Sequence, residues 1–172
     1  MATETILPDG IQSSAQYSTL NLADIDEDPA SPDGTFGTWD GNGNTSCVVD
    51  FPTPTPTPTT GAGLQTFRVE IRRDGGTGSN SVNWSLELWE SGVIVGSALA
   101  TGTTTSTSEV VSGTWDAASL ATSDGSNAQC AMVQTSGGTG GPSARRGLEV
   151  GAFAWDVDYT EGGASRRIIL AG

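Results

Sequence analysis

The chain contains no histidine and no lysine among its 172 residues. Histidine is the usual general base near neutral pH and the commonest metal ligand, while lysine forms Schiff bases and anchors phosphate groups. The absence of both residues excludes most ordinary enzyme mechanisms. The composition therefore indicates a binding or structural protein, with no catalytic residues and no cofactor.

Positive charge is scarce as well: 20 acidic residues accompany only seven arginines, and the formal net charge is -13. Such a surface repels the phosphates of nucleic acids and anionic membranes, so neither is an expected partner. The arginines form three clusters whose guanidinium groups suit bidentate pairing with carboxylates. We expect salt bridges within the fold or between subunits, with contact to a partner protein as the alternative. The arginines are Arg68, Arg72, Arg73, Arg145, Arg146, Arg166 and Arg167.

Cysteine is limited to Cys47 and Cys130. Two cysteines cannot build a disulfide framework or a multi-cysteine zinc site, and both lie in strand-like stretches, so we expect two buried free thiols. The start, Met1-Ala2-Thr3-Glu4, lacks the basic and apolar regions of a secretory signal, which predicts synthesis in a cytosol. The most apolar stretch, 93–100, is too short to cross a bilayer.

No segment shows sustained helical periodicity. Short alternating or β-branched segments are instead separated by Gly, Asp, Asn and Ser, a pattern typical of an antiparallel all-β sandwich. The alternation is clearest over 81–89, where Val82, Trp84 and Leu86 share one face. The expected strands are 46–51, 65–72, 81–89, 105–111, 128–134 and 147–159, with a short edge strand at 168–170.

Local signals refine this pattern. The turn sequence Glu90-Ser91-Gly92 predicts a hairpin over 81–97, and the glycine-rich residues 74–78 predict a second hairpin that joins the strands at 65–72 and 81–89. In 147–159 the apolar residues change parity near Gly151, which indicates either a β-bulge or a strand buried on both faces. Asp116 is expected to cap a short helix within 115–120.

Two segments depart from the strand pattern. In 51–60 proline alternates with threonine, and each proline fixes φ and restricts the residue before it. We expect a stiff, extended connection over the sandwich edge, the alternative being a ligand for a proline-binding module. Residues 1–40 are too acidic and proline-rich to pack alone. We therefore expect 1–40 to form an extended arm or edge segment and 41–172 to form a single β-sandwich domain.

Two acidic turns have the alternate-residue oxygen spacing of calcium loops. One contains Asp24, Asp26 and Asp28, and the other spans 40–44. The first lacks the glycine and the carboxylate that an EF-hand needs at its sixth and twelfth positions. Both segments are expected to be solvated turns, and no metal site is predicted.

A few side chains could act on or bind carbohydrate. The pairs Glu87 with Glu90 and Asp156 with Asp158 could supply the acid and base of a glycosidase, but Asp156 and Asp158 share the solvent parity of one strand. Trp89 lies on the polar parity of its strand and is the best candidate for an exposed aromatic ring that stacks on a sugar.

Several segments together resemble a group of small structural proteins of tailed-bacteriophage virions. They are Met1–Asp9, Asp24–Pro29, Ser31–Gly34, Leu86–Glu90 and Glu149–Trp155. The resemblance spans nearly the whole chain. It implies a jelly-roll-like domain with a structural role in the virion and no catalytic residues, and it does not distinguish the capsid from the tail.

The resemblance and the residue chemistry lead to one main expectation. We expect a capsid decoration or cement protein that contacts the major capsid protein, self-associates and is located on the virion surface. Many repeated modest contacts would stabilise such a shell. A tail-associated β-sandwich is the alternative within this class, and a host-glycan-binding module that uses Trp89 is the alternative from another class.

Overall fold

The computed structural model describes residues 1–41, 43–74, 81–105, 107–137 and 146–161. Within these ranges the regular elements are strands and two short 3-10 helices, neither of which has the length and apolarity of a membrane span. The elements are β1 (Ala2–Ile6), β2 (Gly10–Ala15), β3 (Tyr17–Thr19), η1 (Leu22–Asp24), β4 (Thr38–Trp39), β5 (Ser46–Asp50), β6 (Gln65–Arg73), β7 (Val82–Glu90), β8 (Val93–Ile94), β9 (Ala100–Thr104), β10 (Glu109–Trp115), η2 (Ala117–Ser119), β11 (Ala128–Ser136) and β12 (Leu148–Tyr159).

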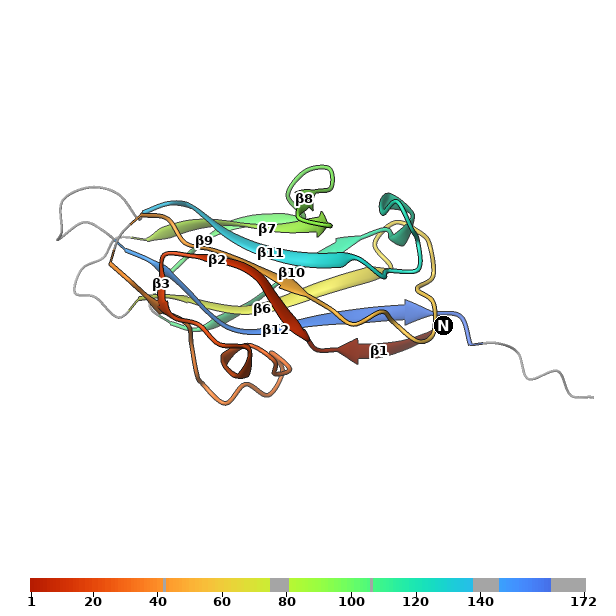
Figure 1. Cartoon of the computed structure of the whole chain (residues 1–172), viewed down its shortest axis with the longest axis horizontal. Helices are drawn as coiled ribbons and strands as arrows, with labels where there is room; N and C mark the ends of the chain where they lie inside the picture. The colour runs from red at the N-terminus through yellow and green to blue at the C-terminus, as the bar shows by residue number, and fades with distance from the viewer. Residues whose placement is uncertain (42, 75–80, 106, 138–145, 162–172) are drawn as a thin grey trace, which may run out of the picture.

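The strands form two layers, which Figure 1 shows one above the other. Sheet A has the order β1-β12-β6-β10. Sheet B has the order β2-β5-β11-β7-β8, with β9 also paired to β7. Every strand pair, including the small β3-β4 pair, is antiparallel. The predicted antiparallel all-β sandwich is therefore confirmed.

The core lies between the two sheets and follows the predicted alternation. Phe67, Val69 and Ile71 of β6 are fully buried, as are Val82 and Leu86 of β7. At one end an aromatic cluster fills the interior with ring centroids 5.2–6.0 Å apart. Its members are Phe51, Phe67, Trp115 and Trp155. Cys47 and Cys130 are buried free thiols, as predicted, and burial raises the pKa of Cys47 to about 12.

Much of the segment 1–40 lies against the sandwich. β1 is an edge strand of sheet A, and β2 is an edge strand of sheet B. Beyond β1 the chain returns to β12, where the amide of Phe153 donates to the carbonyl of Ile25 at 3.0 Å. Ala152 and Ala154 pair with outward-facing residues of β6 and are nonetheless fully buried. Small side chains on the outer face of sheet A thus leave room for a covering segment.

The parity change in β12 has both of its predicted causes. A bulge lies between Val150 and Ala152, and the strand is buried on both faces along most of its length. At Gly151 an added Cβ would lie 2.8 Å from the carbonyl oxygen of Thr35, so glycine permits the covering backbone to approach the bulge closely.

Other local predictions gave mixed results. The β7-β8 hairpin is confirmed, and so is the Asp116 cap, whose side chain accepts from the amide of Ala118. The second predicted hairpin is wrong, because β6 and β7 belong to different sheets. The expected strand at 105–111 is replaced by β9 and β10, also in different sheets, and the expected strand at 168–170 lies outside the described residues.

The proline-rich segment connects β5 of sheet B to β6 of sheet A. Pro54 and Pro58 are buried, and the amide of Thr59 donates to the carbonyl of Asp158 at 2.8 Å. Gly125, at a φ of 77°, packs so closely that an added Cβ would lie 2.5 Å from the Trp155 ring and 3.2 Å from Pro54. The segment is therefore packed onto the end of the aromatic cluster.

Candidate interaction surfaces

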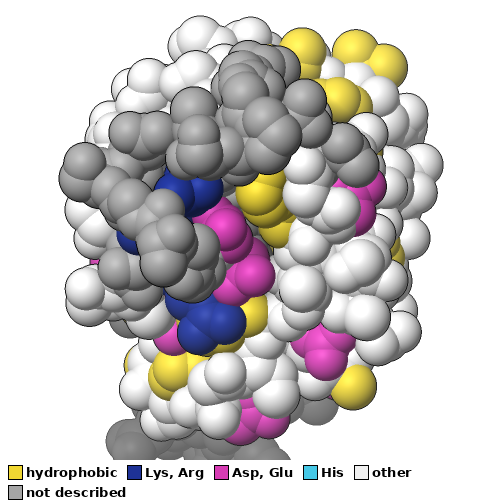
Figure 2. Space-filling model, turned by 90° about the vertical axis from the view of Figure 1, so that its left-hand side faces the viewer, with side chains coloured by type: hydrophobic (Ala, Val, Ile, Leu, Met, Phe, Trp, Pro, Cys, Tyr) yellow, Lys and Arg dark blue, Asp and Glu magenta, His cyan; other side chains and the backbone are white. Residues whose placement is uncertain are grey.

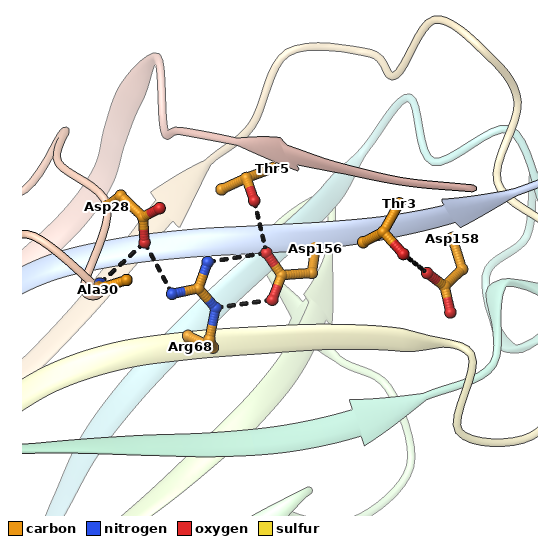
Figure 3. Close-up of polar contacts among 7 residues, drawn as sticks. All are labelled: Thr3, Thr5, Asp28, Ala30, Arg68, Asp156 and Asp158. Carbon is orange, nitrogen blue, oxygen red and sulfur yellow. Dashed lines mark hydrogen bonds and ion pairs between the residues drawn. The ribbon is translucent and has the colours of Figure 1, made fainter.

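Arg68 joins three parts of the chain on the outer face of sheet A (Figure 3). Its Nε and Nη2 donate to the two carboxylate oxygens of Asp156 at 2.6 and 2.8 Å, and its Nη1 donates to Asp28 at 2.7 Å. The hydroxyl of Thr5 on β1 donates to Asp156 at 2.8 Å. This cluster of Asp28, Arg68 and Asp156, here called the Arg68 clamp, ties the acidic segment to β6 and β12.

The charged forms of the clamp residues are favoured. The hydrogen bonds from Arg68 to Asp156, followed by those to Asp28, raise the pKa of the guanidinium. The amide of Ala30, followed by Arg68, lowers the pKa of Asp28. A bidentate, partly buried ion pair is among the stronger kinds. The clamp therefore helps to keep the acidic segment ordered against β6 and β12.

A second arginine contact lies farther along β6. The Nε of Arg72 donates to Glu149 at 2.8 Å, and its guanidinium carbon lies 3.7 Å from the centroid of the Phe36 ring. Arg73 and Arg146 are buried near the same end of the sandwich. Figure 2 shows basic and acidic side chains next to one another at this end.

These contacts assign a role to two of the predicted arginines. Arg68 and Arg72 form the intramolecular salt bridges that were the first expectation for the arginine clusters. The amides of Arg73 and Arg146 bond to backbone carbonyls of neighbouring loops. Arg145, Arg166 and Arg167 lie outside the described residues.

Breaking the clamp should loosen the acidic segment without unfolding the sandwich. We expect Arg68→Met to increase amide hydrogen exchange in residues 20–37 by about tenfold, since a partly exposed charge-assisted bond contributes on the order of 1–2 kcal/mol. Ser112 lies directly opposite Arg68 on β10, so Ser112→Ala is the matched control and should leave this exchange unchanged. Unchanged exchange in Arg68→Met would show that the clamp does not hold the segment.

The same clamp predicts an acid sensitivity. Because the folded pKa of Asp28 is lowered, its stabilising contribution is complete above the ordinary aspartate pKa of about 3.9 and is lost as the pH falls from there through the lowered value. Local opening of residues 20–37, corrected for the intrinsic pH dependence of exchange, should therefore increase only below about pH 4. Opening that begins near neutral pH would assign the segment's stability to other groups.

The end of the β7-β8 hairpin forms the main exposed apolar feature among the described residues. Ser91 and Gly92 both have positive φ, 51° and 82°, as a two-residue hairpin turn requires. Val93 is 65% exposed and Ile94 is 42% exposed, and Ile94 lies opposite the half-buried Trp89. We call Trp89, Val93 and Ile94 the hairpin tip. The chain around β8 rises above sheet B in Figure 1.

Trp89 is held in a defined orientation. Its indole Nε1 donates to Glu87 at 2.8 Å, and the other oxygen of Glu87 accepts from the hydroxyl of Ser85 at 2.7 Å. The turn is fixed by the amide of Gly92, which donates to Gln129 at 2.8 Å. The ring therefore presents its partly exposed surface on the outer face of sheet B.

Two carboxylates of the first predicted acidic turn have structural roles. Asp24, the third residue of η1, accepts from the amide of the N-cap residue Asn21. Asp28 belongs to the Arg68 clamp, and Asp26 is exposed. Within the described ranges no group of three or more acidic or cysteine side chains could hold a metal ion. Of the predicted carboxylate pairs, Asp156 bonds Arg68 and Asp158 accepts from Thr3.

The chain was compared with protein-family models, curated proteins and solved structures, and none of them matches it. The resemblance to virion proteins therefore remains a prediction from the sequence motifs alone.

Proposed function

We propose that this chain is a structural, non-enzymatic protein of a tailed-bacteriophage virion, located on the capsid surface, where it stabilises the head by contacting the major capsid protein. The observation that carries the proposal is the two-sheet sandwich to which the acidic and proline-rich segments are fastened, in a protein whose net charge is -13. The exposed hairpin tip adds an apolar site for contact with a neighbouring copy in the shell, since exposed apolar groups rimmed by polar residues mark protein contacts.

The way the irregular segments are held supports this role. The Arg68 clamp fastens the acidic segment, and burial of Pro54 and Pro58 fastens the proline-rich connection. The molecule can thus present its surface in a fixed arrangement, which reduces the entropy cost of binding. A shell repeats one binding site many times, so modest contacts of this kind add up.

The strand order supports the jelly-roll assignment that forms part of the proposal. Two four-stranded sets, β1-β12-β6-β10 and β5-β11-β7-β9, face each other. The chain passes between the two sheets from β5 to β6, from β6 to β7, and again from β9 through β10 and β11 to β12. Eight strands in two such sheets are what a jelly roll contains.

Removal of the chain from particles tests the proposed function. Particles that lack it should lose resistance to heat or to low salt, and adding the purified chain back should restore that resistance. The control is addition of an equal amount of an unrelated acidic protein. Particles that are equally resistant with and without the chain would remove the cement role.

A tail-associated position is the alternative within the same class. The number of copies per purified virion separates the two positions, because a decorated shell carries hundreds of copies and a tail fibre base or tip carries only a handful. Immunogold labelling would place the chain directly.

The orientation of Trp89 favours a second candidate function, binding of a host glycan. A ring held by Glu87 on an outer sheet face could stack on a sugar. This candidate predicts a signal on a glycan array that is lost in Trp89→Ala. An array without signal would remove it.

A further inference from the structure

Two of the three hairpin-tip residues, Val93 and Ile94, belong to an uncharged part of the chain. Residues 91–108 contain no acidic residue and no arginine. Within them, Val93 and Ile94 form β8, which ends the strand order of sheet B and pairs only with β7 in the described structure. An edge strand of this kind can accept a further extended segment, because the backbone groups on its outer side point away from the sheet.

Charge is divided unequally between the two sheets. Every arginine that the structure describes belongs to sheet A or leads into it: Arg68, Arg72 and Arg73 lie in β6, and Arg146 precedes β12. Sheet B carries Glu87 and Glu90 on β7, the strand that pairs with β8. A segment that binds the tip therefore meets apolar side chains with carboxylates beside them.

The end of the chain has the complementary sequence. Residues 162–172 follow the described part of the chain and contain two arginines and no acidic residue. Arg166 and Arg167 are followed at once by Ile168-Ile169-Leu170, the residues for which the sequence predicts an edge strand. No other stretch of the sequence places two arginines directly before three large aliphatic residues.

We propose that residues 166–170 of one copy bind the hairpin tip of a second copy as an added strand at the β8 edge. The aliphatic residues cover Val93, Ile94 and the exposed part of Trp89, and the arginines pair with Glu87 and Glu90. The inference rests on the proposed function, since a shell holds many copies of the chain side by side.

The topology favours a second copy over the same copy as the source of the segment. The described chain leaves the sandwich after β12, an inner strand of sheet A, whereas the tip lies at an edge of sheet B. A segment from the same copy would have to cross from an inner strand of sheet A to the edge of sheet B, whereas a neighbour's segment can approach the open side of β8. Such a contact is heterologous, so it can link copies in rows or rings.

Sedimentation of the purified full chain over a range of concentrations tests the proposal. We expect reversible association that Ile94→Asp weakens by about tenfold or more, as for a residue at the centre of a small interface. The double change Arg166→Glu with Arg167→Glu should weaken it to a similar extent. Val110 is 49% exposed on β10 of sheet A, so Val110→Asp is the matched control and should leave association unchanged.

A cross-linking experiment identifies the source of the bound segment. A photoreactive residue at position 169, in an equal mixture of nitrogen-14 and nitrogen-15 chains, should give cross-links between position 169 and residues 89–95 in which one peptide is light and the other heavy. Cross-links within one isotope only, or a chain that stays monomeric at every concentration, would overturn the proposal. If Ile94→Asp fails to fold, the arginine variant and the cross-links still decide it.

The two proposals fail separately. Association and cross-linking use the purified chain without particles, and the cement role is measured by the heat and salt resistance of particles. Particles that lose resistance without the chain, together with a monomeric purified chain, would overturn this inference and leave the proposed function standing.

Discussion

Replacing Trp155 with alanine should lower the free energy of unfolding by about 3–5 kcal/mol, the usual cost of truncating a buried tryptophan. Trp155 is fully buried, and its ring lies 5.2 Å from Trp115 and 6.0 Å from both Phe51 and Phe67. Its indole Nε1 also donates to Gln65 at 3.2 Å. The change therefore opens a cavity at the centre of the aromatic cluster and leaves a buried acceptor without its donor.

Urea unfolding followed by far-ultraviolet circular dichroism measures this loss. Trp89→Ala is the control, because it removes the same side chain from a half-buried position on the outer face of sheet B and should cost about 1 kcal/mol. Equal losses at the two positions would mean that the aromatic cluster is not the main apolar support of the sandwich.

The second large effect is expected at Gln134, which is 2% exposed and connects both sheets. Its Oε1 accepts from the amide and hydroxyl of Thr45 and from the amide of Leu148, and its Nε2 donates to the carbonyl of Arg146 at 2.8 Å. Leucine has a similar size and none of these polar atoms. Gln134→Leu should cost at least about 3 kcal/mol, because several buried backbone groups lose their partners together.

The control for this change is Gln12→Leu. Gln12 is exposed on β2 and accepts one hydrogen bond, from Gln129 at 3.0 Å, so its loss should change the free energy of unfolding by no more than about 0.5 kcal/mol. Both variants are compared at the same pH in urea. A loss at Gln134 as small as that at Gln12 would show that its network is dispensable for stability.

Strands with clear alternation, such as β6 and β7, were the most predictable part of the fold. Over 67–71 and 82–88 every second residue is apolar, and the pleat sends those residues to one face. The β7-β8 turn was equally predictable, since Ser91-Gly92 is a short-range signal. The connection from β6 to β7 was not, because residues that follow one another in sequence can cross between sheets, and local alternation is the same in either case.

The candidate surfaces were predicted in part. Strand parity placed Trp89 on the outer face, where the structure has it. The partners of Arg68 could not be predicted, because Asp28 and Asp156 are 40 and 88 residues away in the sequence. The small residues Ala152 and Ala154 were a signal that a segment covers sheet A. Only the structure shows that this segment is the acidic one.

The sequence alone determined the class of secondary structure, the scarcity of positive charge and the residues available for chemistry, because these depend on composition and on neighbours along the chain. Only the tertiary structure decided which strands pair, which face of sheet A the acidic segment covers and which carboxylates hold Arg68. Those outcomes depend on contacts between residues far apart in the sequence, and such contacts form only when two packed sheets bring them together.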